Sequence, residues 1–170
     1  MGTRSSVTGP SPDTATVDYD IKTTKIPPRN TAVIRVAVPP TKIGETLDAV
    51  LPEVAESLEQ HDTAPAGPPF VRYFDFTEDE ADFEAGFPVD DPIPATGRVE
   101  PGELPGGRAA VTVHRGGYDG LQQAHDEIGE WVLAHGHDPS GPVWEVYLTD
   151  PRQEPDSSRW ETEVVWPLRV

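Results

Sequence analysis

The chain has 170 residues, and its 30 acidic and 13 basic side chains give a formal net charge of −17. A surface with this charge repels the phosphates of nucleic acids, so we do not expect the protein to bind DNA or RNA directly. It contains no cysteine, which excludes disulfides, a thiolate nucleophile and a zinc site built on cysteine. Because no apolar run approaches the ~20 residues that cross a bilayer, we expect a soluble cytoplasmic protein. We also expect a protein that needs no cofactor and acts as a monomer.

The chain begins with a segment that has almost no apolar anchor. Residues 1–17 are mainly Ser, Thr, Gly, Pro and Asp, so we predict a mobile leader followed by one domain over residues 18–170. Side chains alternate over 18–26, and branched residues recur at every second position over 32–38, which predicts two strands. Five apolar residues then recur at helical spacing and predict an amphipathic helix over 43–60: Leu47, Val50, Leu51, Val54 and Leu58.

Two strands and a proline-dotted crossover follow this helix. The patterns predict strands over 70–76 and 81–87, and over 88–107 a crossover that links two repeats and is not a domain boundary. The second half opens with a strand over 108–114. A helix is expected over 118–134, because Leu121, Ala124, Ile128, Trp131 and Val132 form one stripe before His135-Gly136.

One unit of the sequence occurs twice. The segment 67–75 returns as 141–150, and each copy is followed by a strand that ends in an aromatic residue and proline, Phe87-Pro88 and Trp166-Pro167. We interpret this as two strand-helix-strand-strand repeats, over about 18–90 and about 108–170. The expected fold is α+β, with an antiparallel sheet, two helices on one face and a ligand groove on the other face.

The two copies differ at one informative position. Val71 in the first copy corresponds to Glu145 in the second, so an acid stands in an otherwise apolar strand. We place Trp144, Val146 and Leu148 under the helices, because this triplet makes the better core. Alternation then directs four side chains to the opposite face, where they would line the groove: Val71, Tyr73, Glu145 and Tyr147.

Residue chemistry leaves three interpretations of this groove open. A carboxylate among aromatic rings suits a flat organic cation, through ion pairing and cation–π contacts. A desolvated Glu145 could instead act as a general base that activates water. A Glu and a Tyr on a solvated face of a half-open sheet would produce the same pattern without any function. No metal site is expected, since His135 and His137 lack a third ligand.

Several segments together resemble a known family. Residues 107–121, Glu130-Trp131, 144–151 and 162–168 resemble the GyrI-like small-molecule-binding domains, relatives of the effector-binding domains of AraC-type and MerR-type multidrug regulators. The likeness runs from about Tyr19 to the C-terminus. It implies the duplicated fold and a pocket for hydrophobic, often cationic compounds over Glu145, with Tyr147 and Tyr118 beside it.

The resemblance also implies alternatives. Stand-alone members are linked to sequestration of drugs or toxins, to protection of gyrase, and in one branch to hydrolysis of cyclopropane-bearing genotoxins. In that branch Glu145 would activate water, with Trp166 or Tyr147 holding the substrate; Phe87 is the counterpart of Trp166 in the first copy. A third function, of a different class from ligand binding and hydrolysis, is an acidic module that contacts a basic partner such as gyrase.

Overall fold

The computed structural model describes residues 19–169, and the predicted leader over 1–17 therefore lies outside the described residues. In the described part, eight strands form one antiparallel sheet in the order β1-β6-β8-β7-β3-β4-β2-β5. Their bounds are β1 Lys22–Ile26, β2 Arg29–Val38, β3 Phe70–Phe76, β4 Ala81–Val89, β5 Glu100–Leu104, β6 Gly107–Arg115, β7 Val143–Tyr147 and β8 Glu161–Pro167.

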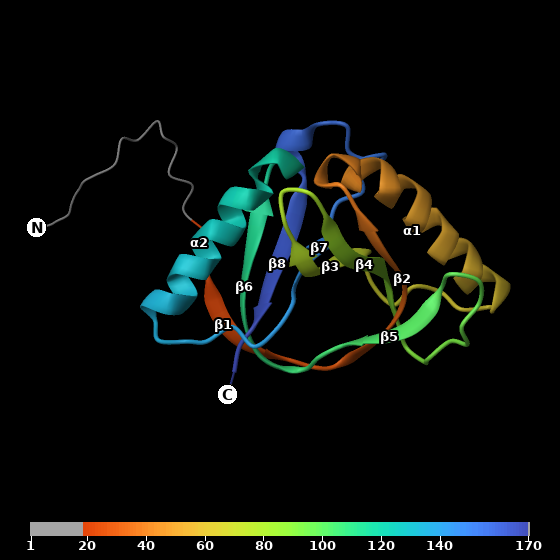
Figure 1. Ribbon diagram of the computed structural model, residues 1–170, viewed down its shortest axis with the longest axis horizontal. Coiled ribbons are helices and arrows are strands. Elements are labelled where there is room, and N and C mark those ends of the chain that lie inside the picture. The colour runs from red at the N-terminus through yellow and green to blue at the C-terminus, as the bar shows by residue number, and fades with distance from the viewer. Residues whose placement is uncertain (1–18, 170) are drawn as a thin grey trace, which may run out of the picture.

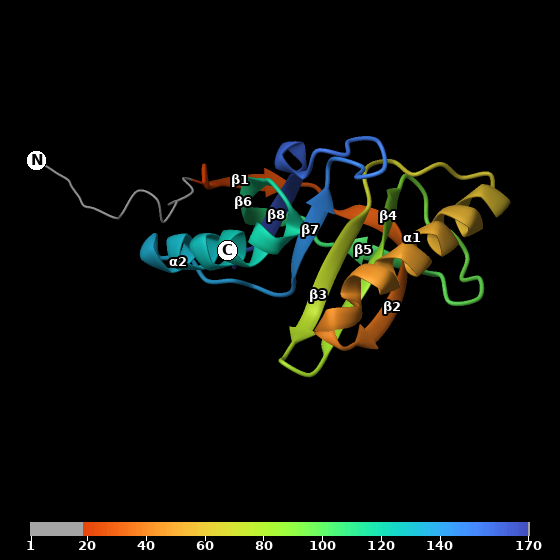
Figure 2. The same cartoon turned by 90° about the horizontal axis from the view of Figure 1, so that it is seen from above.

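Two long helices cover one face of this sheet in the described residues. Helix α1 (Ile43–Gln60) packs on β2 and β4, and α2 (Leu121–Ala134) packs on β6 and β8 (Figure 1). Short 3-10 turns lead into both, η1 (Pro40–Lys42) and η2 (Tyr118–Gly120). A third such turn, η3 (Ser157–Arg159), precedes β8. Seen from above, the helices diverge from each other over the central strands β3 and β7 (Figure 2). The α+β class and the helix-covered antiparallel sheet are confirmed.

The predicted crossover contains a strand that the sequence analysis missed. Residues 100–104 form β5, which pairs with β2 at the edge of the sheet. Their sequence, Glu-Pro-Gly-Glu-Leu, has no strand pattern, and pairing with β2 orders it. The crossover also reaches α1, because Arg98 forms a 2.6 Å ion pair with Glu53.

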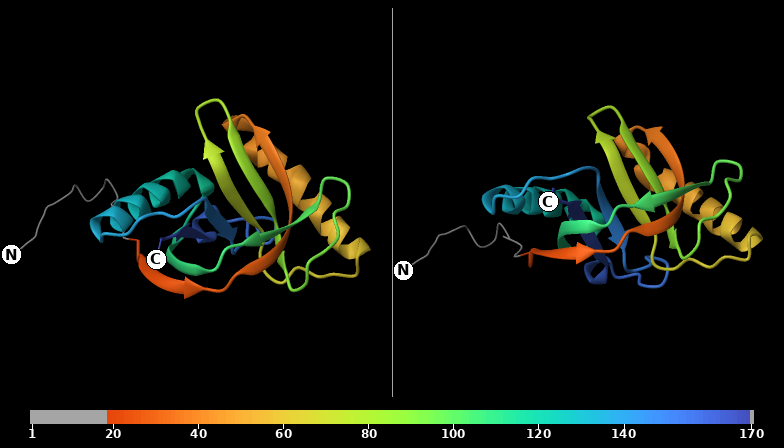
Figure 3. Two further views of the ribbon diagram at one scale, coloured as in Figure 1. Left: turned by 60° about the horizontal axis from the view of Figure 1, so that its bottom comes forward. Right: turned by 90° about the horizontal axis from the view of Figure 1, so that it is seen from below.

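The sheet is strongly curled, and this curl changes which side chains form the core. Views from below show β2, β3 and β4 running at a steep angle to β1 and β6 (Figure 3). The face away from the helices folds toward itself and buries its own apolar cluster, which includes Phe70, Trp144 and Val165. The prediction that Trp144 and Val146 lie under the helices is wrong, because this second core takes them. Leu148 lies beyond the end of β7 and is exposed.

Glycine lets two strands approach closely in this sheet. A Cβ on Gly86 in β4 would lie 1.9 Å from the carbonyl oxygen of Ala32 in β2.

The segments that repeat in the sequence form β3 and β7, which pair at the middle of the sheet. The duplication itself remains a prediction. None of the helices in residues 19–169 is both long and apolar enough to cross a membrane.

Candidate functional site

Glu145 lies at the centre of the helix-covered face. The register aligns it with Val71 of β3 on one side and Val164 of β8 on the other. Val71 belongs to the core under α1 and Val164 to the core under α2. The carboxylate therefore stands between two apolar cores, with only 4% of the residue exposed.

A cleft opens above Glu145, between the two helices. It has a volume of about 1640 Å³, and both helices, the strands β3, β4 and β7, and the segment after β7 contribute to its walls. The predicted groove is thus present, but the prediction that it lies on the face opposite the helices is wrong. The curled sheet fills that opposite face with apolar side chains, and the cleft is instead lined by residues of both helices.

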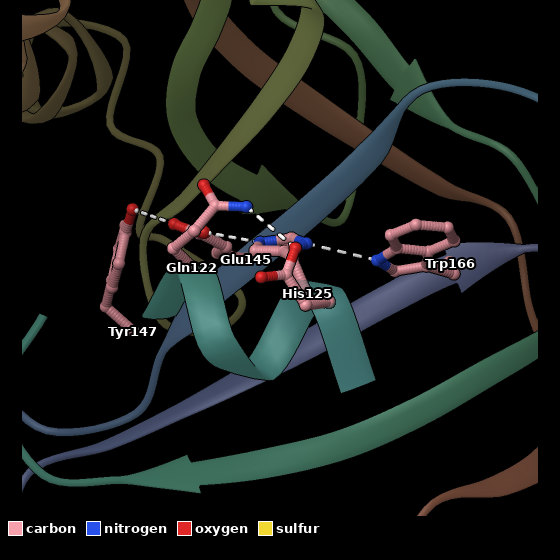
Figure 4. A network of polar contacts seen from close by, with 6 residues as sticks. Gln122, His125, Glu145, Tyr147 and Trp166 are labelled. Atoms are coloured by element: carbon pink, nitrogen blue, oxygen red, sulfur yellow. Dashed lines mark hydrogen bonds and ion pairs between the residues drawn. The ribbon is translucent and has the colours of Figure 1, made fainter. Parts of the chain in front are cut away.

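Both carboxylate oxygens of Glu145 accept hydrogen bonds from the protein. The Tyr147 hydroxyl donates to Oε1 at 2.8 Å, and Nε2 of His125 lies 2.7 Å from Oε2. Figure 4 shows Tyr147, Glu145, His125 and Trp166 in a row from β7 through α2 to β8. These contacts hold the carboxylate in one orientation at the floor of the cleft.

Trp166 defines which nitrogen of His125 carries the proton. The indole Nε1–H donates to Nδ1 of His125 at 3.1 Å, and an indole nitrogen can only donate. Nδ1 must therefore hold a lone pair, and a neutral imidazole then carries its proton on Nε2, where it donates to Glu145. This hydrogen-bond pattern assigns the neutral Nε2–H tautomer.

The tyrosines around Glu145 are held in their neutral form. Burial is the main cause that raises the pKa of both Tyr147 and Tyr73, and the negative charge of Glu145 raises it further. Burial, Asp150 and Glu145 also raise the pKa of Tyr118. At neutral pH the lining of the cleft thus offers three uncharged phenols, with one carboxylate at its floor.

These shifts predict an incomplete tyrosine titration in the folded protein. The chain has four tyrosines, and the fourth, Tyr19, also has a raised pKa, mainly because it is partly buried. At pH 9.5 to 10.5, absorbance at 295 nm should show less tyrosinate in the folded protein than in urea. Since the folded state then binds more protons, stability should fall as the pH rises above the ordinary value of 10.0. Coincident titration curves would contradict the buried placement.

The cleft brings together five of the seven predicted site residues. Its lining includes Tyr73, Phe87, Tyr118, Glu145 and Tyr147. Val71 does not line it, since this side chain is fully buried under α1. Trp166 does not line it either, because it packs beneath α2 behind His125. The crossover over 88–107 contributes no residue to the lining.

His125 was not among the predicted site residues. The sequence places it one turn after Leu121, from where it could reach the groove rim, but the pattern favours a solvated helix face. The signal that could identify it is its spacing: His125 lies four residues after Leu121 and three before Ile128, both of which are buried against the sheet. Helix α1 also contributes more of the cleft wall than the strand pattern suggests, with apolar positions such as Leu47 and Leu51.

Exposed apolar side chains and carboxylates border the cleft. Three of its lining residues, Phe76, Tyr118 and Leu148, are large apolar side chains exposed to solvent. Tyr118 packs against Trp160 with ring centroids 4.9 Å apart.

Besides Glu145, five carboxylates line the walls: Asp48, Glu56, Glu59, Asp119 and Asp150. Arg152, the one Lys or Arg side chain in the lining, is paired with Asp150 at 3.3 Å. The cleft is thus apolar and negatively charged.

Comparison with known proteins agrees with this architecture. The model of the GyrI-like small molecule binding domain matches residues 19–169. No match was found among curated proteins. Among solved structures, the C-terminal domain of EcmrR is 24% identical with a TM-score of 0.77, covering 89% of this chain and 98% of that domain.

Other solved structures share the fold at lower identity. EcmrR in a DNA complex with RPo is 22% identical (TM-score 0.79), and 89% of this chain spans 57% of that chain. A hydrolase encoded by lin2189 from Listeria innocua is 13% identical (TM-score 0.58; 92% of this chain, 95% of that chain). SAV2435 bound to tetraphenylphosphonium is 12% identical (TM-score 0.57; 90% of this chain, 94% of that chain).

Proposed function

The chain belongs to the GyrI-like small-molecule-binding domains, and from this membership and the geometry of the cleft we propose that it binds hydrophobic organic cations with aromatic rings over Glu145. The observation that carries the proposal is the buried carboxylate between two apolar cores, whose hydrogen bonds come from neutral groups. These dipoles orient the charge but do not neutralise it. A bound cation would supply the missing countercharge.

The walls of the cleft favour a particular kind of cation. A small, strongly hydrated ammonium ion would lose its water shell there without gaining enough acceptors, because the floor offers one carboxylate that already accepts two hydrogen bonds. A bulky cation with its charge spread over aromatic rings loses less hydration. Such rings can also pack on Tyr73, Tyr118 and Phe87, where cation–π contacts and apolar burial add to affinity.

The border of the cleft supports the same ligand class. Exposed carboxylates on α1 create a negative field at the entrance, which would attract cations and speed their association. Exposed Phe76 and Leu148 would provide apolar contact once a ligand arrives. Binding of tetraphenylphosphonium by SAV2435, which shares the fold, makes that ion a suitable first probe.

Titration with a matched pair of probes tests this proposal. Tetraphenylphosphonium should bind saturably, and triphenylphosphine oxide, a neutral compound of similar rings, should bind at least about tenfold more weakly because it cannot pair with Glu145. Calorimetry gives both affinities. Tryptophan fluorescence gives a second readout through Trp160, since this indole packs on Tyr118 in the cleft wall. Equal affinity for the two probes would contradict the role of the charge.

Hydrolysis is the second candidate function. The observation that favours it is the 2.7 Å contact between His125 and Glu145, which places a donor and an acceptor of protons side by side at the floor of the cleft. If Glu145 activates water, an electrophilic compound of the cyclopropane type should be converted by the protein. Product formation should then disappear in Glu145→Gln while binding of the compound persists.

A further inference from the structure

Trp166 reaches the floor of the cleft only through His125. Its indole lies beneath α2, where Gly129 leaves room for it: a Cβ at that position would lie 3.0 Å from the indole Cη2. Glycine inside a helix lowers helix stability by about 1 kcal/mol relative to alanine. Gly129 therefore makes α2 less stable, but it lets the indole of Trp166 pack close to the helix. The close approach brings the indole N–H to Nδ1 of His125.

The indole hydrogen bond is compatible with only one charge state of His125. A protonated imidazole carries a hydrogen on each nitrogen, and its Nδ1–H would then point at the indole N–H. Two donors facing each other at 3.1 Å cannot form a hydrogen bond. Protonation of His125 therefore requires the ring or the indole to move.

The net charge of the other groups around His125 favours its protonated form. Glu145 contacts it from β7 and Asp126 is its neighbour on α2. The remaining ionisable groups of the cleft come from α1, β3, η2, β7 and the segment after β7: Asp48, Glu56, Glu59, Tyr73, Tyr118, Asp119, Tyr147, Asp150 and Arg152. The tyrosines are neutral and Arg152 is paired with Asp150, so the net field is negative. The hydrogen bond from Trp166 acts against this field.

We infer that Trp166 is a positioning residue that keeps His125 neutral, and thereby keeps the charge of Glu145 available to a cationic ligand. This inference rests on the proposed function of the cleft. With a protonated His125, Glu145 would already have a countercharge inside the protein, and an incoming cation would meet a neutral pair. Trp166 does not line the cleft, but through His125 it determines the preference of the cleft for cations.

The first test uses the protein without ligand. Nitrogen-15 NMR of the imidazoles should show His125 as the neutral Nε2–H tautomer in the wild type, with its resonance assigned by comparison with His125→Gln. In Trp166→Phe, which keeps a ring but removes the N–H, the titration midpoint of His125 should rise by at least about one pH unit. Trp131→Phe is the matched control, because that indole stacks on His135 and should leave His125 unchanged. An unchanged His125 titration in Trp166→Phe would overturn the inference.

The second test measures affinity for tetraphenylphosphonium from pH 5.5 to 8.5. Trp166→Phe should lose about tenfold or more at pH 6 and regain it by pH 8.5. Adding His125→Gln to this variant should restore binding at pH 6, because an amide cannot take up the proton. A loss that is equal at every pH, or one that the second substitution does not restore, would show that Trp166 acts by packing alone.

A further variant guards against loss of folding in Trp166→Phe. Gly129→Ala keeps the indole but crowds it, so it should raise the His125 titration midpoint in the same direction by a smaller amount. If His125 titrates in Gly129→Ala as in the wild type, the inference fails. If the wild type does not bind tetraphenylphosphonium at all, the proposed function fails, while the ligand-free titrations still decide the role of Trp166.

Discussion

Glu145→Gln is expected to weaken the binding of tetraphenylphosphonium by about 30-fold or more, because losing one partner of a desolvated charge pair costs about 2 kcal/mol or more. Glutamine keeps the volume of the side chain, and its carbonyl can still accept a hydrogen bond at the floor of the cleft. Affinity for triphenylphosphine oxide should change by less than about threefold, since the neutral compound does not use the charge. Calorimetry with both compounds measures the two effects.

A rim carboxylate provides the matched control for this substitution. Glu59 also lines the cleft, but it is exposed at the end of α1. In Glu59→Gln the affinity for tetraphenylphosphonium should fall by less than about threefold, because solvent screens an exposed charge. If Glu59→Gln and Glu145→Gln weaken binding equally, the cation responds to the overall negative field, and the buried carboxylate has no special role.

Gly86→Ala is expected to destabilise the fold by at least about 2–3 kcal/mol. The added methyl group would lie 1.9 Å from the carbonyl oxygen of Ala32, and a backbone atom in a paired strand cannot turn aside as a side chain can. The substitution should push β4 away from β2. Both strands pack against α1, and Phe83 of β4 belongs to the core on that side, so this core should be disturbed as well. Urea unfolding followed by tryptophan fluorescence measures the loss.

Gly44→Ala is the matched control for this effect. Apart from the adjoining residues and the local helix backbone, no atom lies within 4 Å of a Cβ added at Gly44, which stands in the first turn of α1. Alanine there should leave stability unchanged or increase it by up to about 1 kcal/mol, through better helix propensity. Equal destabilisation by both substitutions would show that the close approach of β2 and β4 is not what requires glycine.

The elements themselves were largely predictable from local patterns. The helix over 43–60 and the strand over 70–76 have the predicted bounds, because each has a strong period and clear stop signals. β5 was not predictable, since its sequence has no strand pattern and its partner β2 lies some 70 residues earlier in the chain. Pairing over such distances is set by the whole sheet and not by local propensity.

The location of the groove could not be read from strand alternation. Alternation correctly separates Trp144 from Glu145, but it does not say which set faces the helices. The expectation that the more apolar set lies under the helices holds for a flat sheet with one covered face. Here the sheet curls and gives its other face a core as well, so both faces bury apolar residues.

Glu145, Tyr147, Tyr73, Tyr118 and Phe87 were predicted as site residues and line one cleft. The His125 contact was not predicted, because it joins a helix to a strand 20 positions away and depends on how α2 is rotated over the sheet. Trp166 was expected in contact with a ligand. Its position behind His125 follows from the room left by Gly129, a relation between two elements that the sequence alone does not reveal.

The most direct test of the central claim is to locate the bound cation by NMR of the nitrogen-15-labelled protein titrated with tetraphenylphosphonium. If the cleft over Glu145 is the binding site, the largest amide shifts will surround it, at Tyr73, Tyr118, Gln122 and Tyr147. The second hollow, of about 460 Å³ beside Thr23–Lys25 and Arg108, should show none. Shifts centred on that hollow, or spread evenly over the acidic surface, would contradict the claim.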